Sequence, residues 1–524
     1  VFLKTLYLFT IFFNSNYYFL SSAHKVNCKG KLRPFPDHFI FGASSSAYQI
    51  EGGWDEDGKS NSIWDVMVHE SPSPIKDYST GDVAADSYHK YPRDIEIMKE
   101  LGLEFYKFSI SWTRILPNGL ADKVNTAGLD YYGNLIDGLL HNNITPFVSM
   151  NHFDLPNNLQ KLGGWTNPAM VVIFKDYAKV LFANFGYKVR HWMTIDQPDQ
   201  VCHMGYGSKS KAPMINMTGI ADYLCAKNVL LAHAEVFHLY DDEFRKLQNG
   251  TVGISLNLSW FEQASDTLDD YQAALDARQF DWGLYAHPIF SKLGDYPQEV
   301  KQNVAFKSAE QGYPRSRLPE LTALEVAFIR GSADFLGVNS FTTRMTYRDA
   351  SLEGMYAVPS YKDDIGSVMV KDPSWHQSAS SWLQEVPWGF TKLLIDIKNQ
   401  YDNPPVYVTG NGWSTTGGLL DEARISYMRA YLGALLDAVY EGCNVKGYSV
   451  WALMDTFEWR SGYTEKFGLY EVDFASPEKT RTPRKSAFIY KEIIRSKILD
   501  PDFEPESFIV EIRESQEKDK DLLY

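Results

Sequence analysis

Eight short apolar runs, separated by segments with helical spacing, constrain this chain more than any other feature of its sequence. The runs are rich in β-branched and aromatic residues and begin at Phe39, Phe105, Thr145, Val189, Thr251, Asp334, Pro404 and Val445. Between several of them, as over 130–143 and 422–442, apolar residues recur every three or four positions. Strands that alternate with helices form parallel βαβ units, and eight such units close into a barrel. We therefore expect an α/β fold, a single (β/α)8 TIM barrel with long loops after the strands.

One barrel can account for the length of the chain, because α/β barrels of well over 250 residues form single domains. The 524 residues contain no linker, low-complexity stretch or internal repeat that would divide them. We expect the barrel to occupy residues 30–500 and a charged tail to occupy residues 501–524.

Residues 1–23 have the pattern of a secretory signal peptide. Lys4 precedes an apolar run over 6–13, and the small residues over 21–23 would suit cleavage. A transmembrane anchor is the alternative, but polar residues over 14–16 cut the run short of the ~20 apolar residues that a span needs. Because the chain starts with Val1 and not methionine, we expect the start of this segment to be incomplete. The pattern predicts a secreted, extracellular protein with no membrane span.

The cysteines and the Asn-X-Ser/Thr triplets are also relevant to the prediction that the protein is secreted. Four cysteines are too few and too scattered for a disulfide framework, and no two have the spacing of metal ligands, so we expect no metal site. We expect Cys202 and Cys225 to form a disulfide, because the loop between them is short. The alternative is that all four are small buried side chains, and the sequence leaves open whether Cys28 pairs with Cys443. Asn-X-Ser/Thr triplets compatible with secretion begin at Asn143, Asn216, Asn249 and Asn257.

The charge of the chain argues against one class of partner. Lys and Arg number 51 against 66 Asp and Glu, which gives a net charge of −15. Binding of DNA or RNA depends on a basic footprint that releases counterions. We therefore expect no nucleic-acid partner.

Polar and aromatic side chains gather where the apolar runs end. In a (β/α)8 barrel the active site lies at the C-terminal ends of the strands. Carboxylates and amides there could bind the hydroxyls of a sugar, while flat rings could stack on its apolar face. For any single tryptophan, plain packing is the alternative. The polar set is Gln49, Glu51, His152, Asp154, Asp196, Gln197, Asn339, 409–411, Asp455 and Glu458, and the aromatic set is Trp54, Phe153, Trp165, Trp192, Trp451 and Trp459.

Several segments resemble glycoside hydrolase family one, the β-glucosidases and their relatives. FIFGASSSAYQIEGG over 39–53 is similar to the amino-terminal signature of the family, and the likeness continues through FSISWTRILPNG, NHFDLP, DFLGVN and GYSVWALMDTFEW. The resemblance covers nearly the whole chain after the signal peptide. It implies a (β/α)8 barrel and, in most members, hydrolysis of β-linked glycosides with retained configuration and without a cofactor.

The resemblance assigns the two catalytic carboxyl groups to positions that carry none in this chain. Retaining hydrolysis needs one carboxylate to attack the anomeric carbon and a second carboxyl group about 5 Å away to act as acid and base. The family motifs TFNEP and TENG match TIDQP over 194–198 and TGNG over 409–412. The acid/base position is therefore Gln197 and the nucleophile position is Gly410. We predict that no catalytic residue is intact.

Three further departures concern residues that accompany the catalytic groups in the family. By the resemblance, Lys107 stands at an arginine position, Phe341 at a tyrosine position, and Asp196 at the asparagine before the acid/base. An arginine and a tyrosine hydroxyl would stabilise a carboxylate that is absent here. These linked changes fit a lineage adapted to lacking the reaction. A relocated catalytic role for Asp196 is the alternative.

The resemblance also implies that much of the sugar-binding set is retained. Phe153 and Lys227 stand where tryptophan and histidine are usual in the family, so we expect an altered site and cannot name the ligand. A structural role is the alternative for Glu458, and loop structure is the favoured role for Asp154 and Trp165. The predicted substrate-binding residues are Gln49, His152, Asp196, Asn339, Trp451, Glu458 and Trp459.

Three functions are compatible with these residues. The first is a secreted pseudoenzyme that binds a small glycoside or sugar without cleaving it. The second is an active β-glucosidase or thioglucosidase that uses an unrecognised nucleophile; plant thioglucosidases of the family carry glutamine at the acid/base position but keep the nucleophilic glutamate. The third is a co-receptor-like barrel that meets a protein partner through its surface, and no such partner can be named.

Overall fold

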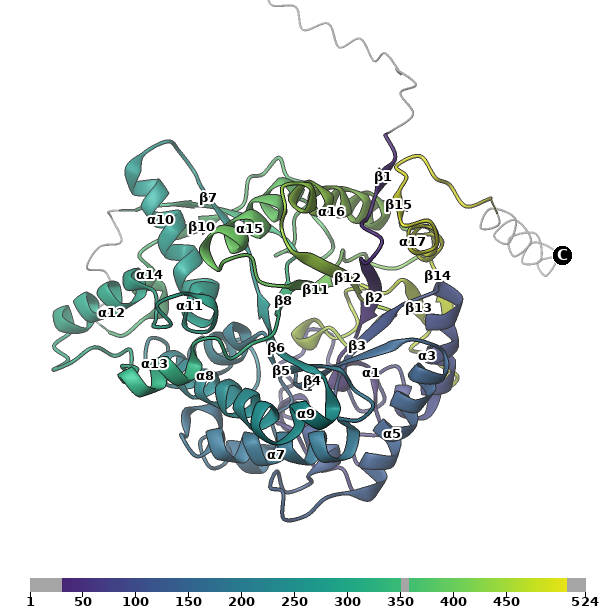
Figure 1. Cartoon of the computed structure of the whole chain (residues 1–524), viewed down its shortest axis with the longest axis horizontal. Coiled ribbons are helices and arrows are strands. Elements are labelled where there is room, and N and C mark those ends of the chain that lie inside the picture. Colours follow the sequence, from purple (N-terminus) through teal and green to yellow (C-terminus); the bar gives the residue numbers. More distant parts are fainter. Residues whose placement is uncertain (1–30, 350–357, 507–524) are drawn as a thin grey trace, which may run out of the picture.

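The computed structural model describes residues 31–349 and 358–506, so the predicted signal peptide, Cys28 and the end of the tail lie outside it. Eight parallel strands close into a barrel in the order β11-β12-β2-β3-β4-β5-β6-β8, and helices surround it (Figure 1). The predicted (β/α)8 barrel is confirmed. Its strands are β2 (Ile40–Ser44), β3 (Phe105–Ser109), β4 (Thr145–Asn151), β5 (His191–Asp196), β6 (Thr251–Asn257), β8 (Leu336–Asn339), β11 (Val406–Asn411) and β12 (Val445–Trp451).

Each predicted apolar run overlaps one barrel strand. The run that begins at Thr145 coincides with β4, and all five residues of β3 are buried. Strands of a parallel barrel are covered on both faces, by helices outside and by side chains inside, so they appear in the sequence as continuous apolar runs. This is why the strands could be located without an alternating pattern.

The helices pack around the outside of the barrel. Two of them, α5 (Thr126–His141) and α16 (Glu422–Tyr440), match the helical patterns seen in the sequence. The other long helices are α3 (Ser87–Leu101), α7 (Met170–Phe185), α8 (Ala221–Leu239), α10 (Leu268–Arg278), α12 (Gln298–Glu310), α15 (Pro387–Gln400) and α17 (Lys485–Ser496). Short helices used below are α1 (Ala47–Ile50), α13 (Ala323–Ile329) and the π-helix η2 (Gln200–Gly207).

Smaller sheets lie outside the barrel. The strands β7 (Trp260–Gln263), β9 (Thr343–Tyr347) and β10 (Val368–Val370) form a three-stranded sheet in the order β10-β9-β7. Near the two ends of the described chain, β1 (Arg33–Pro34) pairs with β15 (Ile498–Leu499). The remaining pair is β13 (Tyr470–Val472) with β14 (Arg481–Pro483).

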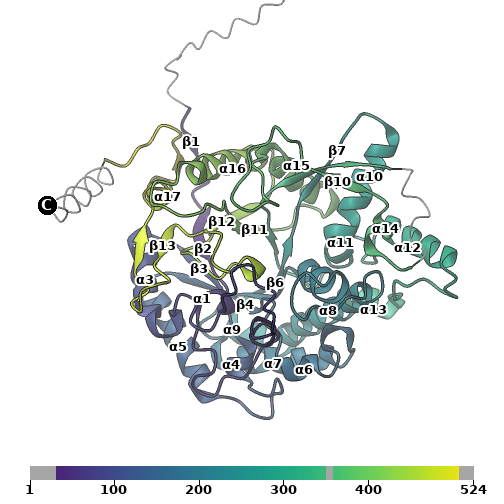
Figure 2. The same cartoon turned by 180° about the vertical axis from the view of Figure 1, so that it is seen from behind.

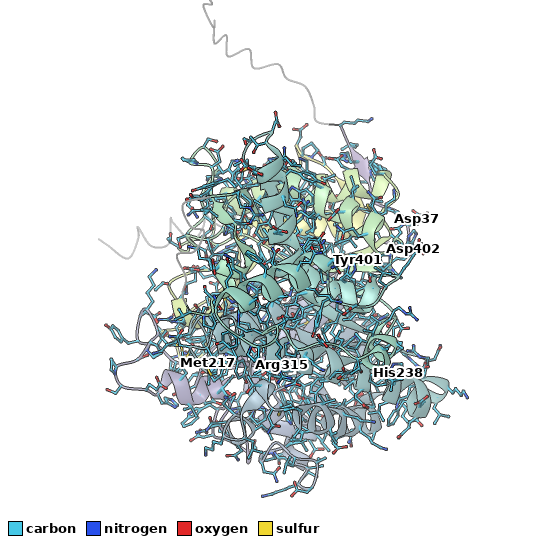
Figure 3. All side chains as sticks on the ribbon, turned by 90° about the vertical axis from the view of Figure 1, so that its left-hand side faces the viewer. Asp37, Met217, His238, Arg315, Tyr401 and Asp402 are labelled. Atoms are coloured by element: carbon cyan, nitrogen blue, oxygen red, sulfur yellow. A yellow bond between two sulfur atoms is a disulfide. The ribbon has the colours of Figure 1, made fainter. Side chains whose placement is uncertain are left out.

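The two ends of the barrel differ in what they carry. In Figure 3, Asp37 and Asp402, which precede β2 and β11, lie on the right, and Met217, in the loop between η2 and α8, lies on the left. In Figure 2, the segments that follow β2 and β12 meet over the middle of the barrel. The backbone N–H of Phe457 donates to the carbonyl of Gln49 there, at 3.0 Å. The loops that follow the strands therefore gather at one end.

The interior of the barrel changes from apolar to polar along the strands. Near the strand starts, Phe105, Phe147, Met193 and Phe335 form a separate buried cluster. Side chains two residues apart on a strand point to the same side, so Lys107 follows Phe105 into the interior. A register irregularity between Met193 and Asp196, relative to β6, breaks this spacing on β5 and brings Asp196 to the same layer. The barrel interior therefore has an apolar layer near the strand starts and a polar layer nearer the strand ends.

The disulfide joins Cys202 of η2 to Cys225 of α8, which is the pair expected from the sequence. Cys443 is a buried free thiol. Three of the four glycosylation asparagines, Asn143, Asn216 and Asn249, are exposed. Among residues 31–349 and 358–506, no helix has the length and apolar content that crossing a membrane requires.

Asn257 differs from the other three glycosylation asparagines. It ends β6, is only partly exposed, and its Nδ2 donates to Asp199 Oδ2 at 3.2 Å. An N-linked glycan would leave one N–H on this nitrogen, so glycosylation at Asn257 stays a prediction.

Candidate active site

A buried ion pair lies at the centre of the polar layer. Lys107 of β3 and Asp196 of β5 are both fully buried, and the Lys107 ammonium contacts Asp196 Oδ2. Ser149 Oγ donates to the same oxygen at 3.1 Å, and Asn339 Nδ2 donates to Asp196 Oδ1 at 2.9 Å. Asn339 is held in turn, because its Oδ1 accepts from Thr409 Oγ1 at 2.8 Å. We call Lys107, Ser149, Asp196, Asn339 and Thr409 the ion-pair cluster.

The surroundings of Asp196 keep it ionised. Burial would raise its pKa, but the charge of Lys107 and the hydrogen bonds donated by Lys107 and Asn339 outweigh burial and lower it. His152 Nδ1 lies 3.6 Å from Asp196 Oδ2. A fully buried carboxylate that is bound on both oxygens offers no surface to a ligand. The expectation that Asp196 contacts substrate directly is therefore wrong for this structure, and its role is to pair with Lys107.

Gly410 lies in β11 beside the ion-pair cluster, and its backbone does not require glycine. Its φ is not positive, unlike that of many other glycines of the chain. A Cβ atom at this position would lie 2.8 Å from Asn339 Oδ1, so a side chain would have to displace the Asn339 amide from Thr409 and Asp196. The space in which a glutamate at 410 would begin is therefore occupied by Asn339.

Gln197 follows β5 in a left-handed backbone conformation, with φ of +50°. Its backbone N–H donates to the Ser255 carbonyl at 2.7 Å, and its side chain is partly exposed. Within the part of the chain that the structure describes, the side-chain amide of Gln197 has no hydrogen-bond partner. It can donate and accept hydrogen bonds, but it has no acidic proton.

A second group of residues lies where the loops after β2, β4 and β12 meet. We call Gln49, His152, Trp451, Glu458 and Trp459 the sugar-side cluster. Gln49 Nε2 donates to Thr456 Oγ1 at 3.1 Å and to the Phe457 carbonyl at 2.8 Å, and its Oε1 accepts from Ser46. Thr456 Oγ1 then donates to Glu458 Oε1 at 2.5 Å. Gln49 is fully buried and positions Glu458 through Thr456.

Glu458 is poised to exchange hydrogen bonds with a ligand. Burial, and after it the nearby carboxylates Glu465 and Asp455, raise its pKa to about 8, against the opposing effects of Thr456 and Lys211. The carboxyl group is therefore mainly protonated at neutral pH and can donate as well as accept. Its Oε2 has no hydrogen-bond partner within residues 31–349 and 358–506.

Aromatic rings form the wall beside Glu458. The Trp459 ring centroid lies 4.8 Å from that of Phe153 and 5.8 Å from that of His152. The Trp451 ring is 6.0 Å from His152. Burial lowers the pKa of His152 to about 3, so its ring is neutral. Neutral imidazole and indole groups beside a protonated carboxyl group suit hydroxyls better than they suit a second charge.

Several predicted residues lie elsewhere. Trp165 and Trp192 are fully buried in the core. Lys227 of α8 forms an ion pair with Glu325 of α13 at 2.9 Å, on the outside of the barrel, so it does not shape the site as expected (Figure 1). The carbonyl of Phe341 accepts from two tyrosine hydroxyls, while its ring packs against Trp382.

Three further predicted carboxyl residues are buried. Glu51 binds Arg114 at 3.2 Å and accepts from the hydroxyl of Tyr132. Asp455 is fully buried and binds both Nη atoms of Arg484. Asp154 is buried, which raises its pKa to about 7. Glu51 and Asp455 are therefore paired within the protein, whereas neither side-chain oxygen of Asp154 has a hydrogen-bond partner in the described residues.

Two residues of the site were missed in the sequence. Thr456 connects Gln49 to Glu458 and could have been noticed as a hydroxyl beside a predicted ligand contact. Lys211 lies in the loop after η2, with Nζ 4.4 Å from the Phe153 ring centroid and 5.7 Å from that of Trp459. Lys211 does not directly follow a predicted strand, so nothing in the sequence marked it as a site residue.

The comparisons with known proteins decide the family. A model described as Glycosyl hydrolase family 1 matches residues 31–498. The chain belongs to glycosyl hydrolase family 1. Within this family it is similar to Myrosinase 1 of Brevicoryne brassicae, with 44% identity over 463 residues, covering 88% of this chain and 98% of that protein.

Solved structures of family 1 have the same fold. An aphid myrosinase matches with a TM-score of 0.84 and 43% identity, over 88% of this chain and 99% of that one. A β-glucosidase of the fungus Humicola insolens, solved in complex with glucose, matches with a TM-score of 0.82 and 34% identity, over 88% and 98% of the two chains. The described residues contain no group of three or more His, Cys, Asp or Glu side chains that could hold a metal ion.

Proposed function

We propose that this chain is a secreted family 1 protein that binds a small glycoside at its sugar-side cluster and does not hydrolyse it. One observation carries the proposal: the position matched to the family nucleophile is Gly410, and the carboxylate beside it, Asp196, is committed to Lys107. Retaining hydrolysis needs an accessible carboxylate at the anomeric carbon. Neither a hydrogen atom nor a buried ion-paired carboxylate can attack a sugar.

The binding half of the proposal rests on the groups left available to a ligand. The Gln197 amide and Glu458 Oε2 have no protein partner in the described part of the chain, and the neutral His152 ring lies 5.8 Å from the ring of Trp459, the residue after Glu458. The relative from Humicola insolens was solved with glucose, which supports a sugar-sized ligand for the corresponding region here. Such groups match the hydroxyls and the ring face of a sugar.

Thioglucoside hydrolysis is the second candidate, because myrosinases are among the similar proteins. A sulfur-linked aglycone can leave without an acid, so Gln197 alone would not prevent the reaction. It would still need a nucleophile, and Gly410 does not supply one. We therefore favour binding without turnover.

The test is turnover across a panel of aryl β-O-glycosides and β-S-glycosides, with an active family 1 enzyme assayed in parallel. We expect kcat/KM at least about 10⁴-fold below that enzyme on every substrate, because catalytic groups that act together lose nearly all of their effect when they are removed. Turnover within 100-fold of the active enzyme on any substrate would refute the proposal.

Binding is tested by isothermal titration with the same panel of glycosides. We expect Glu458→Ala to weaken binding about tenfold or more, because a buried hydrogen bond to the ligand is lost. The control is Glu441→Ala, an exposed glutamate that follows α16 at the other end of the barrel. Failure of every panel member to bind would favour a surface-interaction role instead.

A further inference from the structure

The Lys211 ammonium lies beside aromatic rings of the candidate site and contacts no carboxylate of the described residues. Its Nζ lies against the Phe153 and Trp459 rings, which pack on each other. Among residues 31–349 and 358–506, no carboxylate oxygen lies within 4 Å of this nitrogen, and the nitrogen makes no hydrogen bond to the protein. Other lysines of the chain, such as Lys175 and Lys485, contact carboxylates at 2.7 Å or less. The N–H groups of the Lys211 ammonium are therefore available to donate hydrogen bonds to a ligand.

The carboxyl groups that act on Lys211, those of Asp199 and Glu458, do so from a distance. Asp199 Oδ2 accepts from Gln200 Nε2 at 2.9 Å and from Asn257 Nδ2 at 3.2 Å. Glu458 is mainly protonated at neutral pH, as described above. Burial lowers the pKa of Lys211 to about 8, despite the opposing charges of Asp199 and Glu458, so the amine still carries a proton at neutral pH.

Lys107, Asp196 and His152 do not pair with Lys211. Asp196 and Lys107 form their own pair, and the His152 ring is neutral. The aromatic faces beside Lys211 stabilise a cation but provide no hydrogen-bond acceptor. An ammonium in this position would gain most from a ligand oxygen that carries negative charge.

We propose that the ligand is an anionic glycoside, and that Lys211 binds its carboxylate or sulfate group while the sugar ring rests beside Trp459 and Glu458. This inference rests on the proposed function and adds the chemical class of the ligand. It assigns Lys211 as the residue that selects charged over neutral glycosides. A uronic acid and a sulfated sugar share the required chemistry, namely a negatively charged oxygen on a sugar of ordinary size.

The test compares ligands that differ only in charge. Phenyl β-D-glucuronide, phenyl β-D-glucoside 6-sulfate and neutral phenyl β-D-glucoside are titrated into the full chain at pH 7 and low salt. We expect at least one anionic ligand to bind about tenfold or more tightly than the neutral one, and its identity distinguishes carboxylate from sulfate. The preference should shrink as salt is added.

Lys211→Met removes the charge and keeps an unbranched side chain. We expect it to bring the anionic and neutral ligands to within about threefold of each other, while Lys211→Arg keeps the preference. Lys209→Met, two residues away and exposed, is the matched control and should leave the preference unchanged. Lys211→Gln provides a second neutral variant if Lys211→Met folds poorly.

The outcomes separate the two proposals. If the wild-type protein binds the neutral glycoside as tightly as the anionic ones, or if the preference survives in both neutral variants, the role of Lys211 is wrong and glycoside binding stands. If no ligand binds to the wild-type protein, the proposed function fails and this inference falls with it.

Discussion

The ion-pair cluster and the sugar-side cluster lie at the same end of one barrel but use their polar groups in opposite ways. Around Asp196 both carboxylate oxygens have partners within the protein, and the side chain is fully buried. Around Glu458 one oxygen is held by Thr456 and the other has no partner in the described chain. A site that satisfies its own groups resists ligands, while one that leaves groups open can bind them. We infer that the reaction has been lost at the first and binding kept at the second.

The resemblance to the family implies a shift of charge between two strands. By the family resemblance, the negative charge expected on β11 is absent at Gly410, and a negative charge has appeared on β5 at Asp196. Lys107 keeps a positive charge on β3 and contacts the new carboxylate. A buried cation without a partner is costly, so the carboxylate of Asp196 stabilises the fold by pairing with Lys107.

The largest expected effect is on stability. Asp196→Asn leaves the Lys107 ammonium buried without its counter-charge, and we expect the free energy of unfolding to fall by about 3–5 kcal/mol. Chemical denaturation measures the change. The double variant Lys107→Met with Asp196→Asn should recover much of the loss because it removes both charges. A loss below 1 kcal/mol for the single variant would show that the pair does not hold this region together.

Restoring the reaction should require changes on more than one strand. Gly410→Glu alone should give no useful hydrolysis, because the new carboxylate would meet Asn339 and lie near a second anion, Asp196. Adding Asp196→Asn and Gln197→Glu should raise kcat/KM for an aryl β-glucoside by at least about 100-fold over Gly410→Glu. Robust turnover from the single variant would mean that the ion-pair cluster is no obstacle.

A smaller expected effect is on the pH dependence of stability, which differs between the ion-pair cluster and the sugar-side cluster. The pKa of Glu458 is raised in the folded state, so its contribution to stability is full below about pH 4.5 and is lost as the pH rises to about 8. The pKa of Asp196 is lowered, so its contribution is present above its unfolded pKa of about 4 and is lost as the pH falls below that. Denaturation midpoints from pH 3 to 9 measure both.

Variants of each cluster show which group causes the loss of stability on the acid side and which on the alkaline side of this pH profile. Glu458→Gln should flatten the decline between pH 5 and 8 and leave the acid limb in place. Lys107→Met with Asp196→Asn should do the reverse. If Glu458→Gln leaves the alkaline limb unchanged, the group responsible lies elsewhere, and Asp154, with its pKa raised to about 7 by burial, is the next candidate.

The strands and the family could be predicted from the sequence, whereas the pairing within the site could not. Buried parallel strands are continuous apolar runs, so β4 was located to the residue. Lys107 and Asp196 are 89 positions apart, and their contact depends on the closure of the barrel and on the irregularity of β5. Lys227 was placed in the site because its family position suggested it, but the orientation of α8 directs it to Glu325. Lys211 was missed because a loop sequence does not reveal which wall it approaches.

The absence of a nucleophile is tested most directly by trapping. An activated 2-deoxy-2-fluoro-β-glucosyl fluoride needs no acid to lose its leaving group, so it forms a stable covalent adduct with any protein that retains a working nucleophilic carboxylate. After prolonged incubation with excess reagent, we expect the intact mass of this protein to be unchanged, while an active family 1 enzyme gains one fluorosugar. A stoichiometric mass increase that maps to Asp196 or to another carboxylate would contradict the account.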